Sequence, residues 1–239
     1  MGGRELPGGR DFAGTIRMKN DRLAVLNSIA EQKVMHLFST EDASSACAVA
    51  DAIYAGGGRV IEFTNRARFA QEVFGKLRRH IDETIPDLVL GVGSVEDPAS
   101  ASAFMALGAD FIVSPLFVEE TAVVCNMRKV PYLPGTQTIT EIATAERSGV
   151  EFVKLYPATD PSFVPMVRAP RPWTRIIANG PIDAESAVLW LEQGATAVGT
   201  MMSVPESAVE SGDYDAIVAA VAEMTAAVDS VGSPAGGVA

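Results

Sequence analysis

Residues 151–156 read EFVKLY, a short apolar run that carries one charged residue in its middle and is followed by Pro157. Similar runs recur along the chain, and each is followed by a turn signal and then by a stretch with helical spacing. The runs are VMHLF (34–38), RVIEFT (59–64), LVLGV (88–92), DFIV (110–113), VPYL (130–133), EFVKLY (151–156), TRIIA (174–178) and ATAV (195–198). Strands that alternate with helices in this way predict an α/β fold, a closed (β/α)8 TIM barrel.

The helical stretches set the limits of the predicted domain. They begin near Asp42, Ala67, Asp97, Val118, Thr138, Pro161, Asp183 and Asp213. A leading helix from about Asn20 to Lys33 is expected to close the bottom of the barrel. We therefore expect one barrel domain over residues 11–229, between flexible tails at 1–10 and 230–239, which are rich in Gly, Pro and Ser. A doubly wound open sheet shares the alternation and is the alternative, although no GxGxxG motif follows the first run.

Composition narrows the expected partners. The net charge of −11 argues against nucleic acids and anionic membranes, which need a basic surface. No apolar run is long enough to span a bilayer, and the Gly-rich N-terminus does not resemble a secretory signal, so a cytoplasmic protein is expected. The chain has two cysteines and two histidines without metal-ligand spacing, so we expect buried thiols, no disulfide and no metal site. A small molecule is the expected partner.

Two charged residues interrupt runs that should be apolar, because both faces of a barrel strand are covered. Glu62 lies in the second run and Lys154 in the sixth, each between apolar neighbours that suit contact with helices. Since side chains alternate along a strand, both charges are expected to face the barrel interior. A structural ion pair is one interpretation. A ligand site is the other, because small and polar residues follow the runs, at the barrel end where such sites assemble. These are Ser94, Ser114–Pro115, Pro134–Gly135–Thr136, Asn179–Gly180 and Gly199–Thr200.

A buried lysine can act as a nucleophile, because shelter from water favours its neutral amine. The amine adds to a ketone and loses water, and the resulting iminium withdraws electrons from the neighbouring carbon. Cleavage of the next carbon–carbon bond then requires a general base, for which Glu62 is the candidate. Arg66, in the loop after the second run, could bind a substrate carboxylate with two hydrogen bonds or could be an ordinary surface arginine.

The same segments resemble a known family, the 2-keto-3-deoxy-6-phosphogluconate / 4-hydroxy-2-oxoglutarate aldolases. The likeness runs from about Val34 to Asp215. It rests on GGRVIEFTNR (57–66), LGVGSVEDP (90–98), FIVSP (111–115), VPYLPGTQTITE (130–141) and VEFVKLYPA (150–158). The E-x-T-x-R and F-x-K-x-x-P-A pieces are specific when they occur together in this order.

The resemblance implies a class I mechanism without metal or other cofactor and a homotrimeric barrel. It makes Lys154 the Schiff-base lysine and Glu62 the general acid/base. It implies that Arg66 binds the carboxylate of the substrate with help from Ser94. Ser94 stands where the family usually has a threonine, and it keeps the hydroxyl. Pro115 would line the pyruvate pocket, and Tyr156 takes an aromatic position beside the lysine.

The departures lie on the phosphate side of the family site. Members that cleave sugar phosphates carry Thr-Gly-Gly after strand seven and Gly-Gly-Ser after strand eight. This chain reads Asn179–Gly180–Pro181 and Gly199–Thr200–Met201, so that Asn179, Gly180, Gly199 and Thr200 remain as expected substrate contacts. Pro181 has no N–H and Met201 has no hydroxyl, and each lost charge-assisted hydrogen bond costs about 1.5–3 kcal/mol. We therefore expect an unphosphorylated aldehyde fragment, for which glyoxylate is one alternative to glyceraldehyde 3-phosphate.

The main prediction is an aldolase that cleaves or forms a carbon–carbon bond of a 2-oxo acid and releases pyruvate. Two alternatives stay open on the sequence. An iminium also serves decarboxylation of an oxaloacetate-type acid, because the lysine does not distinguish the leaving group. A non-catalytic barrel with a degenerate phosphate site is the other, although the retention of Glu62, Arg66 and Lys154 together counts against it.

Overall fold

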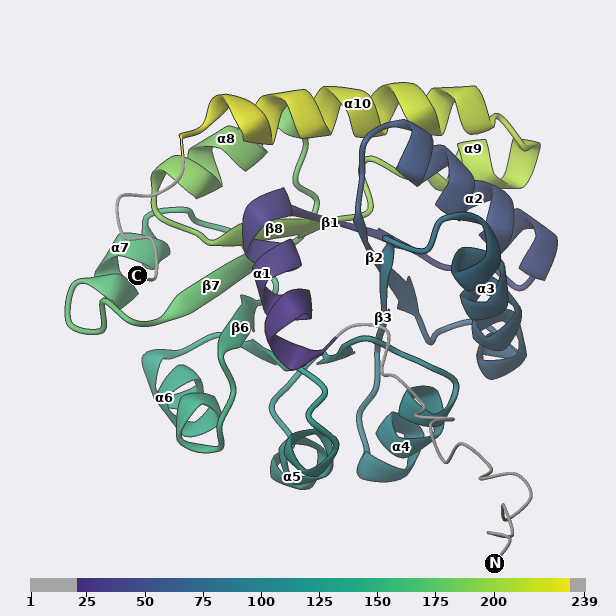
Figure 1. The fold of residues 1–239 in the computed structure, drawn as a ribbon. Helices are drawn as coiled ribbons and strands as arrows, with labels where there is room; N and C mark the ends of the chain where they lie inside the picture. The colour runs from purple at the N-terminus through teal and green to yellow at the C-terminus, as the bar shows by residue number, and fades with distance from the viewer. Residues whose placement is uncertain (1–20, 233–239) are drawn as a thin grey trace, which may run out of the picture.

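The apolar runs form parallel strands, and each strand pairs with the next until β8 pairs with β1 and closes the barrel (Figure 1). The computed structural model describes residues 21–232. Its strands are β1 (Val34–Phe38), β2 (Val60–Thr64), β3 (Val89–Gly93), β4 (Ile112–Ser114), β5 (Tyr132–Thr136), β6 (Phe152–Leu155), β7 (Arg175–Asn179) and β8 (Ala197–Thr200). The (β/α)8 barrel predicted from the sequence is confirmed, and the alternative of an open sheet is wrong.

Helices surround the barrel on its outside (Figure 1). They are α2 (Ala43–Ala55), α3 (Ala70–Thr84), α4 (Pro98–Ala106), α5 (Glu119–Arg128), α6 (Ile139–Arg147), α7 (Phe163–Arg168), α8 (Ala184–Glu192), α9 (Glu206–Ser211) and α10 (Tyr214–Ser230). Asp42, Asp97 and Asp183 are N-caps as expected, because each side chain accepts a hydrogen bond from a backbone N–H of the first turn.

The helix α1 (Arg22–Gln32) precedes β1 and lies across one end of the barrel (Figure 1). Its buried residues Val25, Leu26 and Ile29 belong to the same apolar cluster as the barrel interior. This agrees with the leading helix expected from the sequence, although Asn20 lies outside the described residues. Because α1 covers this end, only the opposite end of the barrel is left for a ligand.

Several boundaries differ from those predicted. β5 continues through Pro134–Gly135–Thr136, which the sequence analysis placed beyond the strand. The run at 110–113 starts with Asp110, whose carboxylate accepts hydrogen bonds from Arg78 and the Leu90 backbone, and β4 begins two residues later. Helix α9 was not expected, because six residues are too few to show a helical period.

The predicted tail at 1–10 lies outside the described residues, as do residues 233–239 of the tail predicted at 230–239. At its C-terminal side, α10 reaches Ser230 and so includes the first residue of that predicted tail. Within residues 21–232, none of the helices combines the length and the apolar character that a bilayer-crossing segment requires.

Alternating side chains divide the core into two apolar clusters. One fills the barrel and contains Val60 and Phe152, and the other lies between strands and helices and contains Ile61 and Val153. The residues that follow Ile61 and Val153 return to the inner face, as strand alternation requires. The expectation that Glu62 and Lys154 face the interior is therefore confirmed.

His36 lies on the outer face of β1 and is fully buried. Its Nδ1 lies 2.7 Å from the hydroxyl oxygen of Ser203, and its Nε2 has no partner within residues 21–232. Burial lowers the pKa of His36 to about 4, because the interior does not solvate an imidazolium cation. In the unfolded chain the same side chain would bind a proton near pH 6.5.

We expect acidification to destabilise the protein through His36. Between these two pKa values the unfolded chain binds more protons than the folded one, so stability falls as the pH is lowered. From pH 7 to pH 5 the loss attributable to His36 is about 2 kcal/mol. Urea unfolding of the wild type and of His36→Gln across this range would test it, with His80→Gln as the matched control. An equal pH dependence in His36→Gln and the wild type would contradict the assignment.

Candidate functional site

An ion pair lies inside the barrel, between Lys154 on β6 and Glu62 on β2. The Nζ of Lys154 donates a hydrogen bond of 2.6 Å to Oε2 of Glu62. The two side chains are only 3% and 4% exposed. Removing both charges from water costs several kcal/mol per ion, and close contact repays part of that cost. The predicted pair is therefore present, on the side of the barrel interior away from α1.

A glycine on the neighbouring strand gives Glu62 its position. Gly93 ends β3, and a Cβ at this residue would overlap Oε1 of Glu62. The carboxylate can therefore lie over β3 and reach across to Lys154. This role of Gly93 could not be predicted from the sequence, because a glycine at the end of a strand is also a common turn residue.

Arg66 and Ser94 lie together at the mouth of the barrel. The Nε of Arg66 donates a hydrogen bond of 3.1 Å to the hydroxyl oxygen of Ser94. Ser94 follows β3 and has a φ of 60°, so its backbone turns directly after the strand. The Arg66 side chain is exposed, and its remaining N–H groups can bind an anion.

A small cavity joins these groups. Arg66, Ser94, Glu62 and Lys154 all line it, and so do the predicted contacts Pro115, Tyr156 and Asn179. Leu37, Val113 and Ser114 complete the lining. Ser114 was expected at this end of the barrel, whereas Leu37 and Val113 were not predicted from the sequence. Leu37 and Val113 belong to the apolar cluster inside the barrel. Their apolar character therefore predicts burial, but it does not distinguish a residue that lines the cavity from any other core residue.

The residues at the ends of β7 and β8 contribute to the cavity in different ways. Asn179 is buried, and its Oδ1 has no partner in the part of the chain that the structure describes. Gly199 makes room for it, because a Cβ there would overlap that oxygen. Gly180 donates its N–H to the carbonyl of Gly199, at 3.2 Å.

Thr200 does not reach the cavity. Its side chain lies on the outer face of β8, where its hydroxyl donates to the carbonyl of Ile182 at 2.7 Å and accepts from the N–H of Met202 at 2.9 Å. Strand alternation explains the difference, since Ala197 faces the interior and the residue three positions later faces the helices. The sequence prediction of Thr200 as a substrate contact therefore has no support from the orientation of its side chain.

The cysteines lie outside this site and are not bonded to each other. Cys125 is buried in α5, and burial raises the pKa of its thiol to about 12. Cys47, in α2, is partly buried, and burial also raises its pKa. The described residues contain no cluster of three His, Cys, Asp or Glu side chains with the geometry of a metal site.

Taken together, the site has an amine, a carboxylate in contact with it and a cationic group at the mouth. An amine in an apolar enclosure can form a covalent bond to a carbonyl carbon. A carboxylate in direct contact can remove or return protons. The guanidinium and hydroxyl at the mouth can bind the acid group of a substrate that is both an acid and a ketone.

Comparison with known proteins points to one family. The family model described as KDPG and KHG aldolase matches residues 25–220. The 2-dehydro-3-deoxy-phosphogluconate aldolase of Dickeya dadantii (strain 3937) is 30% identical over 87% of this chain and 98% of its own length. The KHG/KDPG aldolase of Escherichia coli (strain K12) is 27% identical over 84% of this chain and 94% of its own length.

A solved structure shows the same arrangement of strands and helices. It is the KDPG aldolase of Legionella pneumophila with pyruvate captured as a covalent carbinolamine intermediate, which is 25% identical. It superimposes with a TM-score of 0.77, over 86% of this chain and 98% of that one. The family model covers most of the chain, and the chain therefore belongs to the KDPG and KHG aldolase family.

Proposed function

We propose that this protein is a class I aldolase that cleaves or forms a carbon–carbon bond of a 2-oxo acid and releases or consumes pyruvate. The contact of 2.6 Å between Lys154 and Glu62 inside the barrel carries the proposal. Membership of an aldolase family supports it, and so does a relative that holds pyruvate as a covalent carbinolamine.

The reaction begins at the amine of Lys154. Arg66 and Ser94 bind the carboxylate of the substrate, which brings its C2 carbonyl over the lysine. Transfer of a proton to Glu62 leaves Nζ with a lone pair, and Nζ attacks C2 to give a carbinolamine. Glu62 returns the proton to the hydroxyl of the carbinolamine, water leaves, and an iminium and the free carboxylate of Glu62 remain.

Cleavage follows from the positive charge of the iminium. Glu62 removes the proton of the C4 hydroxyl, the C3–C4 bond breaks, and its electron pair moves to C3 to form an enamine. The C4 fragment leaves as an aldehyde. Protonation of C3 gives the methyl group of pyruvate, and water hydrolyses the iminium to release the product and restore the lysine.

The position of Glu62 favours this reaction over decarboxylation. Decarboxylation of an iminium expels carbon dioxide and requires no base for a hydroxyl proton. A carboxylate in contact with the lysine is what an aldol cleavage requires. The same pair of groups argues against a non-catalytic barrel, since a lone buried ion pair stabilises a fold little.

We also propose that the protein acts as a homotrimer. Val123 and Met127 lie four residues apart on one face of α5, and they are 52% and 77% exposed. Leu116, in the loop before this helix, is 50% exposed. Such a patch supports contact with another copy of the chain. A cytoplasmic location, the role of the other site residues and the domain limits 11–229 stay predictions from the sequence.

Borohydride reduction in the presence of pyruvate is expected to trap a stable adduct on Lys154. Reduction converts the iminium into a secondary amine, which peptide mass analysis locates. Lys154→Met removes the amine and should abolish the adduct, whereas Lys76→Met on the surface of α3 should keep it. If Lys154→Met does not fold, peptide mapping of the wild-type adduct still identifies the lysine. An adduct on another lysine would refute the assignment.

Replacement of Glu62 by Gln separates proton transfer from adduct formation. The amide has the shape of the carboxylate but cannot accept the C4 proton. Without the neighbouring carboxylate, burial favours the neutral amine of Lys154, so trapping with pyruvate is expected to persist. The turnover of a 2-oxo acid substrate is expected to fall by roughly 10²–10⁴. Steady-state rates would check this, with Glu120→Gln in α5 as the matched control. Normal turnover in Glu62→Gln would remove Glu62 from its proposed role.

A further inference from the structure

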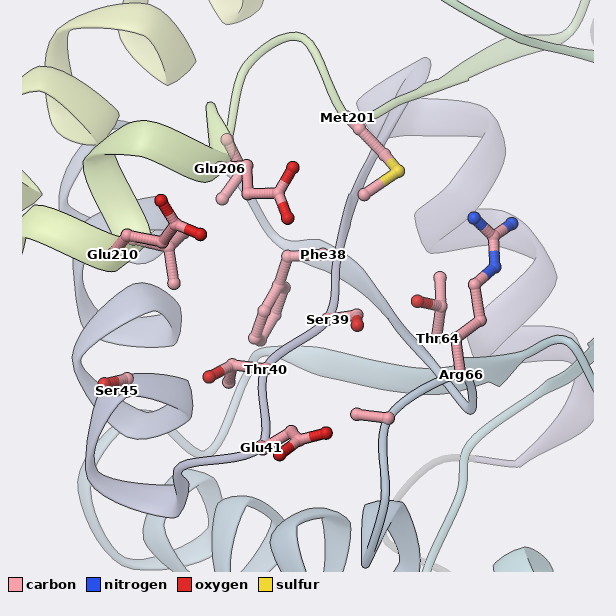
Figure 2. A pocket seen from close by; sticks show the side chains of 13 residues that line it. Phe38, Ser39, Thr40, Glu41, Ser45, Thr64, Arg66, Met201, Glu206 and Glu210 are labelled. Carbon is pink, nitrogen blue, oxygen red and sulfur yellow. The ribbon is translucent and has the colours of Figure 1, made fainter.

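A second, larger pocket opens beside the catalytic cavity, at the ends of β1, β2 and β8 (Figure 2). Its volume is about 600 Å³, whereas the cavity over Lys154 has about 30 Å³. Phe38, Thr64 and Met201 line the larger pocket. The mechanism described above does not use this space.

The larger pocket is connected to the site of the chemistry through β2. Thr64 lies two residues after Glu62 on the same face of the strand, so it stands one layer nearer the barrel mouth. Arg66 lines both spaces. Because Glu62 must reach the C4 hydroxyl, C4 lies beside Glu62. Two larger spaces share lining residues with the small cavity: this pocket shares Arg66, and one of about 260 Å³ beside β5 and α6 shares Pro115 and Tyr156. Because C4 lies beside Glu62, and Thr64 follows on the same face of β2, the chain beyond C4 runs past Thr64 into the pocket at β1, β2 and β8.

The charges around the larger pocket are mostly negative. Glu41, Glu206 and Glu210 line it with exposed side chains (Figure 2). Among the described residues that line it, Arg66 is the one cation, and the substrate carboxylate occupies it in the proposed mechanism. Within residues 21–232, neither Glu206 nor Glu210 forms an ion pair. A phosphate or a second carboxylate at the far end of the substrate would therefore meet like charges.

The same pocket offers hydrogen bonds to hydroxyl groups. Thr64 is 1% exposed, and its hydroxyl has no partner in the described part of the chain. Figure 2 shows this hydroxyl oxygen on the side of Ser39, whose own hydroxyl lines the same space. An unpaired buried hydroxyl is costly, so a hydroxyl from a ligand would be a favourable partner. The carboxylates at the rim can accept further hydrogen bonds from a ligand.

We propose that this pocket binds the distal arm of the substrate, and that this arm is an uncharged chain bearing hydroxyl groups. The substrate class is then a 2-oxo-3-deoxy sugar acid without phosphate. The proposal rests on the proposed aldolase function and deepens it, since it names the aldehyde fragment. It disfavours glyoxylate as well as glyceraldehyde 3-phosphate, because both are anions and glyoxylate would leave most of the pocket empty.

Pyruvate release from three substrates tests the proposal. They are a six-carbon 2-oxo-3-deoxy sugar acid, the same acid phosphorylated at C6, and the dicarboxylate 4-hydroxy-2-oxoglutarate. We expect kcat/KM for the uncharged arm to exceed both anionic cases by about tenfold or more. Borohydride trapping of pyruvate runs alongside, because pyruvate has no distal arm.

Two sets of variants assign the preference to the pocket. The double substitution Glu206→Gln and Glu210→Gln should reduce the preference over the phosphorylated acid by about threefold or more. Glu120→Gln, in the first turn of α5 across the barrel, is the charge-matched control and should keep it. Thr64→Val should lower kcat/KM for the uncharged sugar acid by about tenfold, and Thr64→Ser should restore it because the hydroxyl returns.

A higher kcat/KM for the phosphorylated acid or for the dicarboxylate would overturn the proposal. An unchanged preference in the double variant would overturn it as well. If pyruvate is still trapped and is released from any of the three acids, the aldolase function stands and only the proposed distal arm of the substrate is wrong. If the wild type does not trap pyruvate, both proposals fail.

Discussion

The ion pair between Lys154 and Glu62 is the interaction on which the site depends. It places an amine and a carboxylate in contact inside an apolar barrel, where both groups have almost no access to water. Such a pair contributes little to stability, because the cost of desolvation offsets most of the attraction. Its arrangement is therefore best understood through chemistry. The barrel supplies the enclosure, α1 closes one end, and Gly93 leaves the space in which the carboxylate reaches the lysine.

Much of the fold could be predicted from the sequence because the pattern is local. Each strand is a short apolar run, and several helices begin at an Asp that accepts hydrogen bonds from its own first turn. Because side chains alternate along a strand, the apolar neighbours of Glu62 and Lys154 predicted that both charges face the barrel interior. In the structure these two residues, from distant parts of the chain, are in contact. Charged residues in strands covered on both faces are rare, which made the pair informative.

Other features depend on three-dimensional relations that a single sequence does not carry. Thr200 was expected in the cavity, but its hydroxyl faces the helices, because the register of a short strand decides the face of its last residue. Helix α9 was missed, and with it the two glutamates that line the larger pocket. The role of Gly93 follows from the closeness of two strands, and a glycine has no side chain to indicate such a contact.

We expect the amine of Lys154 and the carboxylate of Glu62 to act on pyruvate itself, without any aldehyde. Exchange of the pyruvate methyl protons with D2O, followed by proton NMR, measures this most directly, since an enamine must form for exchange to occur. The wild type should exchange them rapidly, Lys154→Met should not exchange them, and Glu62→Gln should be slower by roughly 10²–10⁴. Exchange at the wild-type rate in Lys154→Met, or none in the wild type, would contradict the account.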